Sequence, residues 1–180
     1  FMNELEESLY HPSVYTGELY LELHRGTLTN QNQIKRNNRK AEFALRDLEY
    51  MTVREAVTRD RAADGEKINP LTELLLINQF HDILPGTCIP EAHDDAIRDV
   101  TGVIEAAAKA TAEIAAGLAG GESDSAAVEN SITAINSLSF RLNDVIYLPF
   151  EDSFVEGDYR QQVVTDRDGA RWLAVAGAEI

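Results

Sequence analysis

The sequence predicts an α+β protein in which a three-helix bundle is followed by a partial antiparallel β segment. Hydrophobic residues recur at helical spacing before residue 120, a glycine-rich polar break follows, and β-branched or alternating patterns begin after it. Helices first and strands second is the order of an α+β fold or of two domains, not of alternating α/β units. We therefore expect an N-terminal segment at 1–16, a bundle at 17–119, a linker at 120–130 and the start of a β domain at 131–180.

The first long helix is predicted to begin after Thr29 and Asn30, whose side chains are suited to an N-cap. Beyond this cap, apolar residues recur at helical spacing and charged residues occupy the positions between them. This pattern indicates an amphipathic helix of about six turns. The apolar positions are Ile34, Ala41, Ala44, Leu45, Leu48 and Met51.

The second and third helices are marked by their prolines. Asn69 followed by Pro70 predicts a helix start, and leucines on most sides predict a buried helix that ends at Pro85-Gly86. A third helix is expected from Pro90. Its seam advances alternately by three and four residues, as helices of a bundle do. The seam consists of Ile97, Val100, Ile104, Ala107, Thr111, Ile114 and Leu118.

Strand patterns fill the last part of the chain. Residues 144–150 are β-branched and aromatic, which favours a strand. Asp168-Gly169 separates Val163–Thr165 from Trp172–Val175, and this dipeptide between apolar runs predicts a hairpin.

Composition excludes several classes of function. The 180 residues include 16 basic and 31 acidic side chains, a net charge of −15, which argues against a nucleic-acid binder or an anionic-membrane binder. No apolar run approaches the length of a membrane span. Cys88 is the single cysteine, so an intrachain disulfide and a multi-cysteine zinc site are excluded, and we expect a reducing, cytoplasmic setting.

The densest group of reactive side chains is the tract QFHDILPGT at residues 79–87. His81 and Asp82 precede a rigid corner, where an imidazole nitrogen could ligate a metal and a carboxylate could orient a substrate hydroxyl or support the metal. A structural interpretation stays open beside this one, because helix C-termini favour histidine through the helix dipole. One histidine is also not a complete zinc site.

Two further groups carry weaker signals. His93, Asp94 and Asp95 lie at the predicted start of the third helix, where acidic residues are favoured by the dipole, so we expect a solvated helix start. Arg25 could contact a sugar or phosphate oxygen, or form a surface ion pair. Trp172 is interpreted as a packing residue. The sequence contains no phosphate loop and no nucleophile elbow.

Three tracts resemble the glycoside hydrolase family 38 α-mannosidases. They are GELYLELHRGTLT at residues 17–29, QIKRNNRKAE at 33–42 and LINQFHDILPGT at 76–87. The match is to the middle three-helix-bundle domain of that family, between the catalytic barrel and the C-terminal β domains. NSLSF at 136–140, followed by Asp144 and Val145, is similar to the opening strand of the β region.

This resemblance implies retaining hydrolysis of α-mannosidic bonds, with zinc binding the substrate hydroxyls. It implies that His81 is a zinc ligand, that Asp82 contacts the substrate or supports the metal, and that Arg25 reaches the cleft. The catalytic aspartate and the remaining zinc ligands would belong to an N-terminal domain that this chain lacks. We therefore expect a fragment that has no catalytic residue of its own, binds zinc weakly and is inactive alone.

Two other hypotheses remain at this stage. The chain could be a non-catalytic helical interaction or structural module with a small β appendage, which would explain the helical seam and the incomplete active site. Alternatively, His81, Asp82, His93 and Asp94 could together form a self-sufficient metallohydrolase site.

Overall fold

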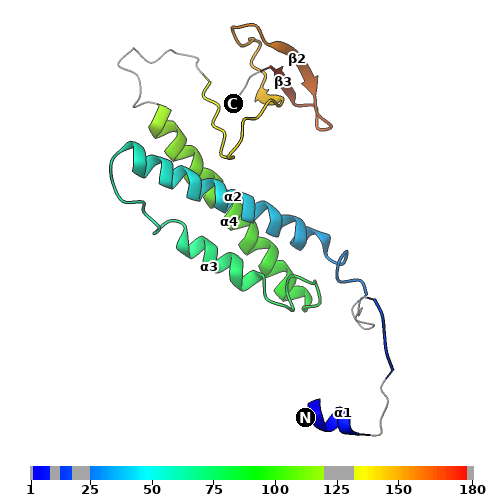
Figure 1. Cartoon of the computed structure of the whole chain (residues 1–180). Coiled ribbons are helices and arrows are strands. Elements are labelled where there is room, and N and C mark those ends of the chain that lie inside the picture. The colour runs from blue at the N-terminus through cyan, green and yellow to red at the C-terminus, as the bar shows by residue number, and fades with distance from the viewer. Residues whose placement is uncertain (1, 9–12, 18–24, 120–131, 178–180) are drawn as a thin grey trace.

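A computed structural model of the chain describes residues 2–8, 13–17, 25–119 and 132–177. Helices α2, α3 and α4 pack together, and three strands later in the chain form a sheet, which confirms the predicted α+β class (Figure 1). The predicted linker at 120–130 lies outside the described residues, so the boundary between bundle and sheet stays a prediction. In chain order the elements are α1 (Met2–Glu7), α2 (Asn32–Thr58), α3 (Asn69–Asn78), α4 (Pro90–Ala119), β1 (Ile146–Pro149), β2 (Arg160–Thr165) and β3 (Arg171–Ala176).

Helix α2 has the predicted apolar face but a different N-terminus. Its N-cap is Gln31, which adopts the left-handed conformation (φ 48°, ψ 52°) and makes no side-chain capping bond. The prediction that Thr29 and Asn30 form the cap is therefore wrong, and the Asn30 side chain instead donates to the Gly86 carbonyl oxygen. The predicted core positions Ile34, Ala41, Leu45, Leu48 and Met51 are buried, and Ala44 is half-buried.

Helix α3 is less buried than its sequence predicts. Leu75 is buried, but Leu76 and Ile77 are 59% and 65% exposed. The helix packs mainly against α4 and more narrowly against α2, which leaves its opposite side open. The N-cap is Ile68 rather than Asn69, and Pro70 lies in the first turn as expected. The prediction of burial on most sides was wrong because a helix at the edge of the bundle has neighbours on one side only.

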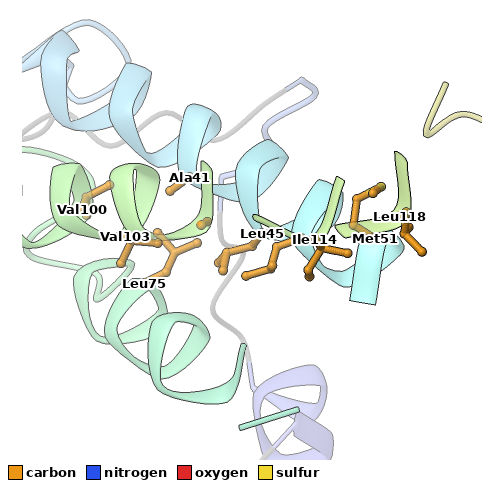
Figure 2. Close-up of a cluster of buried hydrophobic side chains, with 10 residues drawn as sticks. Ala41, Leu45, Met51, Leu75, Val100, Val103, Ile114 and Leu118 are labelled. Atoms are coloured by element: carbon orange, nitrogen blue, oxygen red, sulfur yellow. The ribbon is translucent and has the colours of Figure 1, made fainter. Parts of the chain in front are cut away.

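The core of the bundle lies between α2 and α4, with α3 closing one side (Figure 2). Small residues allow the two long helices to approach, since Ala41 on α2 and Ala107 on α4 are both fully buried. Val103 is also fully buried although the predicted seam omitted it. The core cluster comprises Ala41, Leu45, Leu48, Met51, Leu75, Val100, Val103, Ala107, Ile114 and Leu118.

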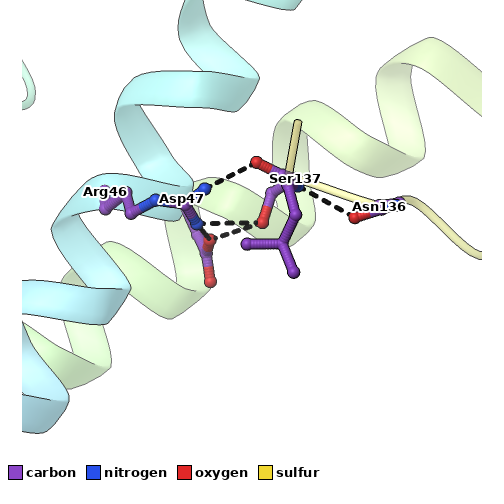
Figure 3. Close-up of polar contacts among 5 residues, drawn as sticks. Arg46, Asp47, Asn136 and Ser137 are labelled. Carbon is purple, nitrogen blue, oxygen red and sulfur yellow. Dashed lines mark hydrogen bonds and ion pairs between the residues drawn. The ribbon is translucent and has the colours of Figure 1, made fainter. Parts of the chain in front are cut away.

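The segment between α4 and the sheet is attached at Ser137 to the middle of α2 (Figure 3). The Ser137 hydroxyl donates to Asp47 Oδ1 at 2.9 Å, and Arg46 Nη2 donates to the Ser137 carbonyl oxygen at 2.7 Å. Ile135 packs against the bundle core. Residues 136–140 include no strand, and 138–140 form a bend, which corrects the expectation of an opening strand there.

The sheet confirms the predicted hairpin. β2 and β3 pair antiparallel around the turn at Asp168 and Gly169, and β1 pairs antiparallel with the other edge of β3, which gives the strand order β1-β3-β2. Leu173 and Val175 of the central strand are buried. In the part of the chain that the structure describes, no helix has the length and apolarity needed to cross a membrane.

Asp166 organises the hairpin turn through its carboxylate. Oδ2 accepts the Trp172 indole N–H at 2.9 Å, and Oδ1 accepts the backbone N–H of Ala170 at 2.8 Å and of Asp168 at 3.0 Å. These bonds, that of Trp172 foremost, hold the pKa of Asp166 below its ordinary value of 3.8. Because the folded-state pKa is depressed, this stabilising effect is complete above the unfolded-state pKa and is lost as pH falls through the folded-state value.

We expect the NMR shift of the Trp172 indole proton to titrate with a midpoint below pH 3.8, as Asp166 takes up its proton. Asp166→Asn should abolish this step, since an amide oxygen does not titrate. Asp158→Asn, which alters an exposed carboxylate outside the turn, serves as the matched control and should leave the step in place. Identical titration of the wild type and Asp166→Asn would contradict the assignment.

Candidate functional site

His81 and Asp82 lie in a turn that begins after α3 has ended. The backbone N–H of Ile83 donates to the Phe80 carbonyl oxygen at 2.9 Å, which closes the chain around the two residues. This corrects the expectation that the second helix continues to Pro85, because α3 ends before the turn begins. A turn exposes its side chains more fully than a packed helix face does.

Both side chains of the pair face solvent. The His81 side chain is 76% exposed and that of Asp82 is 63% exposed. His81 Nε2 lies 3.5 Å from Asp82 Oδ2, and the imidazole packs at 4.1 Å between ring centroids against Phe80. The pair therefore offers one imidazole and one carboxylate at the surface, within reach of a ligand that approaches from outside the bundle.

The chain that follows Asp82 is held by residues around the N-terminus of α2. The Lys35 ammonium donates to the carbonyl oxygens of Leu84 and Pro85, each at 3.2 Å, and also to that of Asn30. The Asn30 amide donates to the Gly86 carbonyl oxygen at 2.7 Å. Partial burial lowers the pKa of Lys35 from its ordinary value.

The chain that precedes His81 is also held by α2. Gln79 Nε2 donates to Asn38 Oδ1 at 3.0 Å and to Glu42 Oε1 at 3.1 Å. Asn38 Nδ2 donates to the same Glu42 oxygen at 2.9 Å, and Arg39 forms an ion pair with the other oxygen at 2.7 Å. One helix therefore contacts the polypeptide on both sides of the turn.

Gly86 allows this close approach to α2. Its φ is +79°, and a Cβ atom at this position would lie 2.8 Å from Gln31 Cβ and 2.9 Å from Gln31 Cγ. Any side chain would thus meet both backbone strain and a steric clash. The sequence pattern predicts Gly86 only as a helix terminator, and no local signal reveals its close approach to Gln31 across the turn.

His93 differs from His81 in its surroundings. Its side chain is 17% exposed, its Nδ1 lies 3.3 Å from Asp94 Oδ1, and its Nε2 is buried without a hydrogen-bond partner among the described residues. Asp94 and Asp95 are exposed at the start of α4, as predicted for a solvated helix start, whereas His93 is mostly covered.

The described residues do not form a complete metal site. No group of three or more histidine, cysteine, aspartate or glutamate side chains within these ranges could hold an ion together. His81, Asp82, His93 and Asp94 are all described, so the structure does not support the hypothesis that they form a self-sufficient metal centre. Arg25 is exposed in the loop before α2, the loop that also contains Asn30.

Comparison with known protein families gives a match to the part of the chain that forms the bundle and the His81 turn. A family model described as the α-mannosidase middle domain matches residues 22–118, which is more than half of the chain. The match includes α2, α3, the turn with His81 and nearly all of α4. The chain belongs to the α-mannosidase middle-domain family.

Curated relatives share the similarity and are much longer proteins. Alpha-mannosidase 2C1 of Mus musculus is 32% identical over 139 residues, which cover 75% of this chain and 13% of the mouse protein. Alpha-mannosidase of Saccharomyces cerevisiae is 44% identical over 77 residues, 42% of this chain and 7% of the yeast protein. Alpha-mannosidase G of Dictyostelium discoideum is 37% identical over 101 residues, 54% of this chain and 9% of that protein.

Proposed function

We propose that this chain is the middle portion of a retaining, zinc-dependent α-mannosidase, to which it contributes His81 as a metal ligand. The observation that supports this most directly is the solvent-facing pair of His81 and Asp82 on a turn held from both sides. Family membership supplies the reaction class, since the relatives are named as α-mannosidases.

The donor chemistry of the turn fits part of a zinc site. Zinc in proteins is bound by imidazole nitrogen, thiolate sulfur and carboxylate oxygen, with three or four protein ligands. His81 would offer the imidazole, and Asp82, whose Oδ2 lies 3.5 Å from His81 Nε2, would orient it or contact the substrate. The remaining ligands and the catalytic carboxylates would come from other parts of the complete enzyme. Bound zinc would supply a positive centre for substrate hydroxyls.

An exposed apolar surface beside the turn is the candidate contact for the catalytic domain. Leu76 and Ile77 in the last turn of α3 are 59% and 65% exposed, and Phe80, directly before His81, is 53% exposed. Large apolar side chains that gather at a surface are typical of interfaces. Docking of the catalytic domain over this surface would bring its zinc ligands to His81. Arg25 remains a candidate substrate contact, because its loop also contacts the turn through Asn30.

Zinc titration of this chain and of the complete enzyme tests the proposal. We expect millimolar zinc binding and no α-mannoside hydrolysis by this chain, because the described residues provide an incomplete ligand set. The complete enzyme should bind one zinc ion tightly and hydrolyse an α-mannoside. Tight stoichiometric binding by this chain would contradict an incomplete site. A complete enzyme without zinc dependence would favour the alternative of a purely structural helical module.

A further inference from the structure

We propose that Lys35 is a positioning residue, which fixes the His81 turn against α2 so that the imidazole is preorganised for the metal. The inference rests on the function proposed above and extends it to a side chain that does not touch the metal. Gln79, which holds the other side of the turn through Asn38 and Glu42, assists it.

The need for such a residue follows from the exposure of His81. A metal ligand must be held close to its productive geometry by packing or by hydrogen bonds to its support. The His81 side chain is 76% exposed and contacts Phe80, which is itself 53% exposed, so core packing does not hold the ring. Its position must therefore be set largely by the backbone of the turn.

Lys35 is suited to fix that backbone. An ammonium group has three N–H donors, and the structure gives Lys35 three carbonyl acceptors. Two of these, Leu84 and Pro85, follow Asp82 closely, and the third, Asn30, belongs to the loop before α2. Hydrogen bonds from a charged donor are stronger than neutral ones. A single cation thus joins the turn to the N-terminal end of α2.

The polar contacts of Gln79 complete the attachment on the other side. Its two amide hydrogens are directed to two acceptors on α2, the side chains of Asn38 and Glu42. The helix that receives both attachments is anchored independently, because its buried apolar residues form the bundle core with α4. Loss of Lys35 should therefore loosen the turn without unfolding the bundle.

The test compares Lys35→Met with Lys40→Met in the complete enzyme. Lys40 is an exposed lysine of the same helix and provides the matched control. We expect Lys35→Met to weaken zinc affinity, measured by chelator competition, by about 10- to 100-fold, the range for lost support of a metal ligand. Its kcat should fall with KM little changed, whereas its Tm should stay near that of Lys40→Met. Lys35→Arg, which keeps the charge and several donors, should recover part of the zinc affinity.

Gln79→Met removes the hydrogen bonds that join the other side of the turn to α2. If Lys35→Met fails to fold, the zinc affinity of Gln79→Met provides the test. Zinc affinity within twofold of wild type in a folded variant would overturn the inference. Loss of zinc affinity that only parallels a loss of Tm would assign a structural role instead and would also overturn it. His81→Ala separates the two proposals. If His81→Ala loses zinc and Lys35→Met does not, only the positioning role fails, whereas zinc retained by His81→Ala removes the proposed function itself.

Discussion

Replacing His81 by alanine in the complete enzyme should weaken zinc binding by more than about 100-fold, the upper figure for loss of an outer-shell partner. A direct ligand contributes more than a residue that supports one, and alanine offers no donor. Activity on an α-mannoside should fall at least as far. The fold should be unaffected, because the His81 side chain is 76% exposed, and surface substitutions change the free energy of unfolding by about 0.5 kcal/mol or less.

His93→Ala provides the control for this prediction, because its expected effects are the reverse. The His93 side chain is only 17% exposed, so its removal should lower Tm. Zinc content should remain that of the wild type, since the His93 ring is mostly covered and its Nε2 is buried, so it is not presented to an ion outside the bundle as the His81 ring is. Metal analysis and thermal unfolding of both variants measure the two effects. Unchanged zinc and rate in His81→Ala would remove the metal-ligand role.

The core of the bundle was predictable because its apolar residues recur at the spacing of a helix face. Helical spacing alone identified Leu45 and Leu48 on α2 and Ala107 and Ile114 on α4, all of which are buried. The predicted seam of α4 was too narrow, because that helix contacts both α2 and α3 and buries a wider stripe that includes Val103.

The attachments of the His81 turn were not predictable from local patterns. Lys35 and the two carbonyl oxygens of the turn are about fifty residues apart in the chain, and no spacing rule connects them. The only signal was indirect: Lys35 and Asn38 lie in one tract that resembles the α-mannosidases, and His81 lies in another. That similarity did not reveal that the two tracts meet, or which of their atoms do so.

The exposed side of α3 shows where a correct pattern led to a wrong expectation. Leucine and isoleucine on most sides of a helix predict burial, yet Leu76 and Ile77 face solvent in this chain. The pattern is explained if the complete enzyme covers this surface with another domain, as we propose for the catalytic domain. Leu76 and Ile77 would then be buried in the whole protein, although they are exposed in the bundle alone.

Leu48→Ala and Leu76→Ala are a matched pair that tests this explanation through stability. Leu48 is fully buried in the core, so its truncation in this chain should lower the free energy of unfolding by about 2–5 kcal/mol, the usual cost of such a cavity. Leu76→Ala removes the same atoms from a side chain that is 59% exposed and should cost about 0.5 kcal/mol or less. Urea unfolding of the two variants measures both values, and similar losses would contradict the assigned packing.

The same pair gives a different result in the complete enzyme if the catalytic domain docks on α3. Leu76 would then be buried at the interface, and Leu76→Ala should become destabilising, because apolar area removed from water contributes about 25 cal/mol per Å². Leu48→Ala should remain costly in either context, since its neighbours lie within the bundle. Thermal unfolding of the complete enzyme, with Leu48→Ala as the reference, measures the change. If Leu76→Ala were as stable as wild type in the complete enzyme, the exposed side of α3 would not be covered there. The other zinc ligands would then have to reach His81 without a domain contact through that surface.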